Sequence, residues 1–152
     1  MSPAADGATR PGGPDLLVIG AGPAGLAAAA TAAGQGARVT LVDANAAPGG
    51  QVWRAVESAS PRLAALLGPD YAEGAAAVAR LRASGAEVLQ ATTVWHLAAG
   101  EAADPRPEVG LIAGGRARLL RPARVLVATG AVERPMPVPG WTLPGVMTAG
   151  GA

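Results

Sequence analysis

A six-residue glycine pattern near the N-terminus constrains the fold of this chain more than any other feature. Residues 20–25 read Gly-Ala-Gly-Pro-Ala-Gly, which is a G-x-G-x-x-G pattern. The continuous apolar run before it, residues 16–19, is typical of a buried parallel strand. The Ala-rich run after it, residues 24–33, favours a helix because Ala has the highest helix propensity. The pattern therefore predicts a strand that turns tightly into a helix.

The next segment turns this pattern into a candidate binding site. Residues 38–42 predict a second strand, which ends at Asp43, 18 residues after Gly25. A strand–helix–strand unit of this kind binds a nucleotide diphosphate at the helix N-terminus, and Gly22 lets the backbone approach it closely. An acid at the end of the second strand accepts hydrogen bonds from ribose hydroxyls and disfavours a 2′-phosphate. The alternative is a turn that needs its glycines only for packing.

The remaining pattern predicts one α/β domain with two kinds of sheet. Ser60 and Asp70 are expected to cap helices that end near Gly68 and Gly85, with Glu73 completing a capping box at the second. Gly114-Gly115 predicts a tight hairpin turn. The expected later strands are 87–90, then a β-meander of 92–97, 108–112 and 116–120, then a buried strand at 125–128. Residues 1–13 predict a disordered tail and residues 14–152 a single domain.

Composition excludes several classes of function. The formal net charge is +1, which predicts no strong attraction to nucleic acid or to acidic membranes. The sequence contains no Cys, so it offers no disulfide, no thiolate metal site and no redox-active Cys pair, and no metal site is expected. Residues 16–33 are uncharged, but their Gly and Pro favour the strand–turn–helix over a membrane span. Without a basic N-terminal region, a cytoplasmic location is expected.

Later motifs carry a resemblance to a known family. Gly49-Gly50-Gln51 follows the second strand, and Ala128-Thr129-Gly130 follows the last one. From about residue 15 to its end, the chain resembles the glutathione-reductase-like (pyridine nucleotide-disulfide oxidoreductase) flavoproteins. The motifs at 48–54, 128–135 and 139–146 are similar to those of the FAD-binding subunits of opine oxidase, hydroxyproline dehydrogenase and hydrogen cyanide synthase.

The resemblance implies a fold, a cofactor and partners. The fold would be an incomplete Rossmann-like FAD/NAD(P)-binding fold, and the cofactor would be FAD. The protein would be part of a heteromeric dehydrogenase that acts on an amine, opine or amino acid through partner subunits. Such subunits are longer, so we expect this chain to be the N-terminal part of one and inactive alone. An NAD-binding dehydrogenase domain and a non-catalytic truncated fragment are the alternatives.

The resemblance also assigns residues to the cofactor. It places Gly20, Gly22, Pro23, Ala24 and Gly25 around the diphosphate, Asp43 at the ribose and Ala44 beside the adenosine. Gly50 and Gln51 would lie near the diphosphate or the ribityl chain, and the Val94 backbone would face the adenine. Thr129 and Gly130 would border the flavin chain. No catalytic residue is expected, since a flavin itself carries the redox chemistry. His96 is interpreted as a structural or surface residue, while Trp53 and Arg54 are equally compatible with cofactor contact and with packing.

Overall fold

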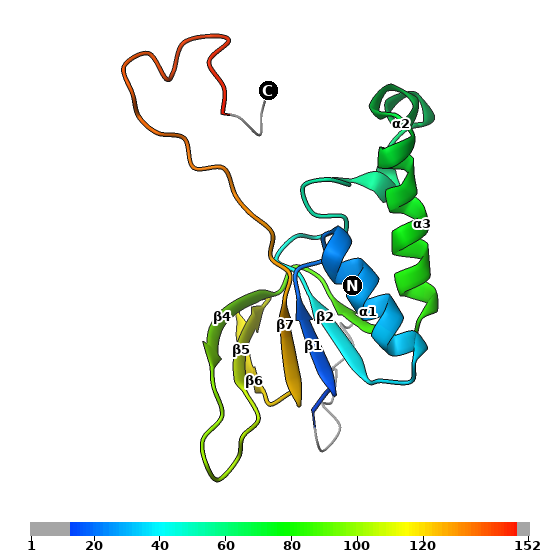
Figure 1. Cartoon of the computed structure of the whole chain (residues 1–152), viewed down its shortest axis with the longest axis vertical. Coiled ribbons are helices and arrows are strands. Elements are labelled where there is room, and N and C mark those ends of the chain that lie inside the picture. Colours follow the sequence, from blue (N-terminus) through cyan, green and yellow to red (C-terminus); the bar gives the residue numbers. More distant parts are fainter. Residues whose placement is uncertain (1–12, 149–152) are drawn as a thin grey trace.

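The computed structural model describes residues 13–148 of the chain. Residues 1–12, which hold nearly all of the predicted disordered tail, and residues 149–152 lie outside the described part. Figure 1 shows the arrangement of the elements. In chain order they are β1 (Leu16–Ile19), α1 (Pro23–Gly34), β2 (Val39–Val42), the short 3-10 helix η1 (Val56–Ser58), α2 (Pro61–Leu67), α3 (Pro69–Ala83), β3 (Glu87–Leu89), β4 (Thr93–Ala98), β5 (Glu108–Ala113), β6 (Arg116–Leu120) and β7 (Arg124–Val127).

The predicted combination of a parallel sheet and an antiparallel meander is confirmed. The first sheet is parallel, with strand order β3-β2-β1-β7, and Leu16 pairs with both Val39 and Arg124. The second sheet is antiparallel, with order β4-β5-β6. Gly114 and Gly115 form its tight turn, with φ of 55° and 76°. These left-handed values are the ones that a two-residue hairpin turn requires.

Two apolar clusters cover the two faces of the parallel sheet. Helices α1 and α3 lie on one face and the meander on the other (Figure 1). Val18 of β1 packs toward the helices with Leu26 of α1, whereas its neighbour Leu17 packs toward the meander with Val109 of β5. Successive side chains of a strand point to opposite faces. A strand buried on both faces must therefore be apolar throughout, which explains the continuous run at β1.

The caps of α2 and α3 differ from each other. Ser60 caps α2 as predicted, since its side-chain oxygen accepts a hydrogen bond from the Leu63 amide at 3.2 Å. The predicted capping box of Asp70 and Glu73 is wrong, because α3 begins at Pro69 and its N-cap is Gly68, two residues before the predicted cap. Gly68 has φ of 87°, so it both ends α2 and starts α3. Two helices can follow each other without a linker because this residue adopts a left-handed φ.

Strand β7 is more exposed than the sequence pattern predicts. Leu126 is 38% exposed and Val127 is 58% exposed, so the expectation of a buried strand at 125–128 is wrong. Among the described residues β7 has a neighbour on one side only, which is β1. After β7 the segment 131–148 extends away from both sheets (Figure 1). An edge strand leaves part of its apolar surface uncovered, whatever its composition.

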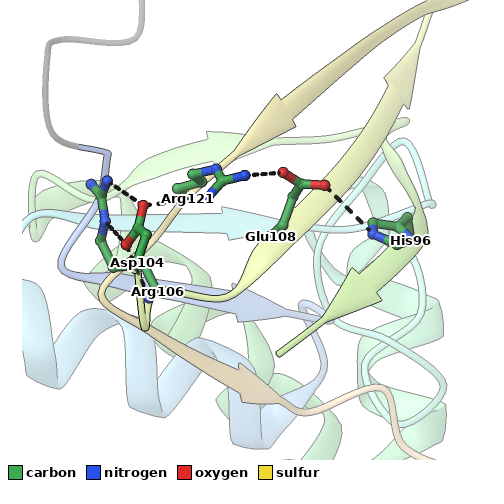
Figure 2. Close-up of polar contacts among 5 residues, drawn as sticks. All are labelled: His96, Asp104, Arg106, Glu108 and Arg121. Carbon is green, nitrogen blue, oxygen red and sulfur yellow. Dashed lines mark hydrogen bonds and ion pairs between the residues drawn. The ribbon is translucent and has the colours of Figure 1, made fainter. Parts of the chain in front are cut away.

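A chain of ion pairs crosses the meander (Figure 2). Asp104, in the loop between β4 and β5, accepts hydrogen bonds from Arg106 at 2.8 Å and from Arg121 at 3.3 Å. Arg121, which follows β6, also contacts Glu108 at 2.5 Å. The other oxygen of Glu108 lies 3.8 Å from His96 Nε2. The network joins the loop to the ends of β5 and β6, and it contains the single histidine of the chain.

This network predicts an acid-sensitive contribution to stability. The hydrogen bonds from Arg106, helped by Arg121, hold the pKa of Asp104 well below its usual value of 3.8. Because the pKa is lower in the folded state, the stabilisation is present above the usual pKa and is lost as the pH falls toward the folded-state pKa. We therefore expect Asp104→Asn to lower the urea midpoint near pH 6 and to have a smaller effect at pH 2–3. A difference between parent and variant that stays constant from pH 6 to pH 2 would contradict this expectation.

Candidate nucleotide-binding site

The glycine pattern begins at a point where three strands of the parallel sheet end together. The Gly20 amide donates to the Val42 carbonyl oxygen at 2.8 Å, and the Ala128 amide donates to the Ile19 carbonyl oxygen at 2.8 Å. Gly20 has φ of 105°, and a Cβ on it would lie 2.4 Å from the carbonyl oxygen of Ala128. Only glycine fits this crossing. Ligands of open α/β sheets bind just beyond such carboxyl ends of strands.

The N-terminus of α1 is open and carries no side-chain cap. Its N-cap residue is Gly22, in an extended conformation, and the first helical residue is Pro23. The first amide groups of a helix have no acceptor within the helix, and together they carry a partial positive charge. Among residues 13–148, a Cβ on Gly22 would have only the Gly50 Cα nearby, at 4.0 Å. Within the described part of the chain, the space beside Gly22 is therefore open to an anionic group.

Gly25 meets a different requirement from Gly22. A Cβ on Gly25 would lie 1.8 Å from the carbonyl oxygen of Gly20. The first turn of α1 thus packs directly on the strand end, and Gly25 is needed for that contact. Within this pattern, the fold requires glycine at Gly20 and Gly25, because a Cβ at either position would clash with backbone atoms. At Gly22 a Cβ would meet no such clash.

The loop that contains the Gly-Gly-Gln motif lies against the glycine turn. The Gly49 amide donates to the Ala21 carbonyl oxygen at 2.8 Å. Gly50 has φ of 62°, and a Cβ on it would lie 2.8 Å from the Gly22 Cα. Gln51 is exposed, and its side-chain oxygen accepts a hydrogen bond from Arg54. Two motifs that are about 25 residues apart therefore form one surface in front of α1.

Asp43, at the end of β2, is only 8% exposed, and its carboxylate accepts three hydrogen bonds. Its Oδ2 accepts from the Ala21 amide of the glycine turn at 2.5 Å. Its Oδ1 accepts from the backbone amide of Asn45 at 2.7 Å and from the side-chain amide of Asn45 at 2.8 Å. The sequence reasoning placed Asp43 but missed Asn45. The signal was available, because an Asp followed two residues later by a polar donor often closes a turn of this type.

A pocket of about 400 Å³ opens beside Asp43 at the carboxyl ends of the parallel strands. Strand β4 of the meander forms its opposite wall, through Val94 and Leu97. Five of the predicted site residues line this pocket: Gly20, Asp43, Ala44, Val94 and Thr129. Its other lining residues, which the sequence did not single out, are Ile19, Val42, Asn45, Thr92, Thr93, Leu97 and Val127.

The other predicted site residues lie outside this pocket. They are Gly22, Pro23, Ala24, Gly25, Gly50, Gln51 and Gly130. All but Gly130 belong to the N-terminus of α1 or to the loop packed against it. Pro23 also lines a second pocket, of about 470 Å³, between α1 and α3. Gly130 is exposed just after β7.

The structure defines the contacts of Trp53, Arg54 and His96. Trp53 packs into the helix-side cluster, and its indole nitrogen donates to the Asp70 carbonyl oxygen at 2.9 Å. The backbone carbonyl of Arg54 accepts from the Tyr71 hydroxyl at 2.7 Å. The centroid of the His96 ring lies 5.4 Å from that of the Trp95 ring. Along the chain, His96 is far from the glycine turn. Within residues 13–148 no three His, Asp or Glu side chains are grouped closely enough to hold a metal ion.

Comparison with known proteins shows to which family this chain belongs. The model of the pyridine nucleotide-disulphide oxidoreductase family matches residues 14–149. This chain belongs to that family. The resemblance seen in the sequence is confirmed. No helix in the described part of this family member is long and apolar enough to cross a membrane.

Individual relatives agree with the family. One opine oxidase subunit, from Agrobacterium tumefaciens (strain Ach5), is 50% identical over 140 residues, which cover 91% of this chain and 28% of that protein. The HcnB subunit of hydrogen cyanide synthase from Pseudomonas protegens is 34% identical over 136 residues, which cover 89% of this chain and 28% of that protein. The chain therefore spans 28% of the length of either relative.

A solved structure confirms the fold of this family member. L-Proline dehydrogenase from P. horikoshii superposes with a TM-score of 0.63 at 22% sequence identity. The match covers 81% of this chain and 24% of that one. The arrangement of a parallel sheet between helices and a meander is thus a fold that this chain shares with that structure.

Proposed function

We propose that this chain binds FAD at the N-terminus of α1 and in the pocket beside Asp43, as the cofactor-holding part of a flavin-dependent oxidoreductase. The observation that carries the proposal is the open space at Gly22. In the glycine turn a Cβ is blocked at Gly20 and at Gly25 but not at Gly22, which faces the uncapped helix end. A dinucleotide diphosphate needs this combination of free amides and close backbone approach.

The diphosphate would lie in front of α1. The amides of the first helical turn, including those of Ala24 and Gly25, have no helical acceptors and would donate to phosphate oxygens. Pro23 has no amide hydrogen, so it adds no donor without a helical acceptor, and its fixed φ favours the start of a helix. Gly50, packed against Gly22, would form the other wall of the phosphate cradle. Gln51 would lie beside it.

The adenosine half would occupy the pocket of about 400 Å³. Asp43 is the carboxylate that lines it, and would accept a hydrogen bond from a ribose hydroxyl. The same negative charge would repel a 2′-phosphate, which disfavours NADP. Ala44, Val94 and Leu97 would supply the apolar contacts to the adenine ring. Such pockets, mostly apolar with a few placed polar groups, are typical of cofactor sites.

The flavin end would lie toward β7. Thr129 lines the pocket and Gly130 follows it at the end of the strand, so these two residues would border the chain that leads to the flavin. When bound, the flavin would supply the redox chemistry by accepting a hydride from the substrate. The residues of this chain would bind the cofactor and orient it.

The relatives indicate the class of reaction for the whole protein. A relative that is 50% identical is named as one of the subunits of an opine oxidase. We therefore propose an oxidation of opine-like or amino-acid-like amines by a hetero-oligomeric complex, in which other subunits contribute to the substrate site. A cytoplasmic location and the single domain at residues 14–152 stay predictions.

The cofactor can be identified directly. The chain, and any longer protein that contains it, would be purified, unfolded in acid and analysed by liquid chromatography and mass spectrometry. We expect FAD to be released, together with a flavin absorbance spectrum before unfolding. Release of NAD alone, or of no nucleotide from either protein, would contradict the proposal. Dye reduction with opine-like and proline-like amines, measured on the longer protein with its partner subunits, would then test the reaction class.

A further inference from the structure

Asn45 lies at a junction that no part of the glycine pattern predicts. Its backbone amide and its side-chain amide both donate to Asp43 Oδ1, at 2.7 Å and 2.8 Å. Its carbonyl oxygen accepts from the Ala91 amide at 2.9 Å. Ala91 follows β3 and has a left-handed φ of 48°, which is uncommon for a residue other than glycine. Asn45 therefore joins the turns that follow two neighbouring strands.

The hydrogen bonds of Asp43 determine how much of its carboxylate is available to a ligand. A carboxylate has about four lone-pair positions. Asn45 occupies two of them on Oδ1, and the Ala21 amide occupies one on Oδ2. Room for about one more donor remains, on Oδ2. Because both oxygens are held, the carboxylate cannot rotate to present a different edge to the pocket that it lines.

We infer that Asn45 is a positioning residue, whose side-chain amide fixes the Asp43 carboxylate so that Oδ2 faces a ribose hydroxyl of the bound nucleotide. The inference rests on the proposed function and adds a residue to it. Asn45 holds Oδ1 while the Ala21 amide of the glycine turn holds Oδ2, so the same carboxylate is aligned to the phosphate cradle and to the ribose. Removing the side-chain donor leaves Oδ1 held by the backbone amide alone, so the carboxylate is held less firmly at that oxygen and its orientation toward the pocket is less well defined.

The consequence is a change in selectivity for ribose hydroxyls, and not a uniform weakening of binding. A hydrogen bond to a charged group contributes enough for the unsubstituted chain to prefer ADP over 2′,3′-dideoxy-ADP by about tenfold or more. In Asn45→Ala this preference should fall to about threefold or less. Asn45→Ser keeps a short hydroxyl donor and should recover part of the preference.

The experiment is calorimetric titration of the 152-residue chain with ADP and with 2′,3′-dideoxy-ADP. The variants are Asn45→Ala, Asn45→Ser, Asp43→Ala and the double variant Asp43→Ala/Asn45→Ala. Gln35→Ala, which removes an exposed side-chain amide just after α1, is the matched control and should keep the preference. In the Asp43→Ala background, Asn45→Ala should change the preference no further, because the group that it positions is absent.

The outcomes separate this inference from the proposed function. If Asn45→Ala weakens ADP and dideoxy-ADP equally, Asn45 only supports the fold and the inference is overturned while nucleotide binding stands. The same holds if Asn45→Ser loses the preference as fully as Asn45→Ala. If the unsubstituted chain binds neither ligand, the proposed function fails, and this inference fails with it. A preference lost in Asn45→Ala and partly regained in Asn45→Ser supports it.

Discussion

Replacing Gly22 by valine should remove FAD binding, with a loss of affinity of at least about 100-fold, while the chain stays folded. A valine side chain would project into the space before the N-terminus of α1, where the diphosphate is proposed to lie. The fold itself has room for it, because the nearest atom to a Cβ is the Gly50 Cα at 4.0 Å. Gly22 has φ of −76° and ψ of −178°, which a β-branched residue adopts without strain.

The measurement combines affinity with stability. ADP or FAD affinity and the thermal midpoint would be compared for the parent chain, Gly22→Val and Gly34→Val. Gly34 is the matched control because it ends the same helix and a Cβ on it meets none of the described residues within 4 Å. Losing glycine as the N-cap should cost Gly22→Val no more than about 1 kcal/mol of stability. Equal nucleotide affinity in folded Gly22→Val and parent would show that the turn serves packing only.

Replacing Gly25 by alanine should instead destabilise the fold, by about 3 kcal/mol or more in the free energy of unfolding. Alanine is a better helix former than glycine by about 1 kcal/mol, so propensity alone predicts a gain. The contact decides the sign: a Cβ at Gly25 would lie 1.8 Å from the Gly20 carbonyl oxygen, and that oxygen belongs to the backbone. To admit the methyl group, α1 must move away from the strand end.

Urea unfolding followed by circular dichroism would test this prediction, with Gly34→Ala as the control in the same helix. The control should be as stable as the parent or slightly more stable, since nothing lies near its Cβ. If Gly25→Ala had the urea midpoint of the parent, the close packing of α1 on the glycine turn would be wrong. Together, the Gly22 and Gly25 variants separate the ligand's requirement for glycine from the fold's.

The parts of the fold that depend on local pattern could be predicted from the sequence. The continuous apolar run at residues 16–19 and the strand ending at Asp43 were enough to place β1, α1 and β2. The Gly114-Gly115 pair was enough to place the meander turn, because two successive left-handed residues fit few other structures. Each of these signals depends on neighbours within a few residues.

The parts that depend on tertiary neighbours could not be predicted. Residues 125–128 are apolar, but their exposure depends on what lies beside β7, and a strand's composition does not reveal that it is at an edge. The false capping box arose because Asp70 fits the pattern of a cap, whereas Gly68 lets α3 begin earlier. The role of Asp43 in holding the glycine turn was missed because its partner, the Ala21 amide, is 22 positions away.

The order of strands in the parallel sheet has a consequence for how the chain acquires its structure during synthesis. β1 emerges first from the ribosome, yet one of its two edges pairs with β7, about a hundred residues later. At typical elongation rates, β1 waits about 5 to 20 s for that partner. During this interval its backbone groups on that side have no strand to bond, and the crossing at Gly20, which needs Ala128, cannot form. The crossing at Gly20 therefore forms only after Ala128 has been synthesised, although the glycine pattern itself is translated about a hundred residues earlier.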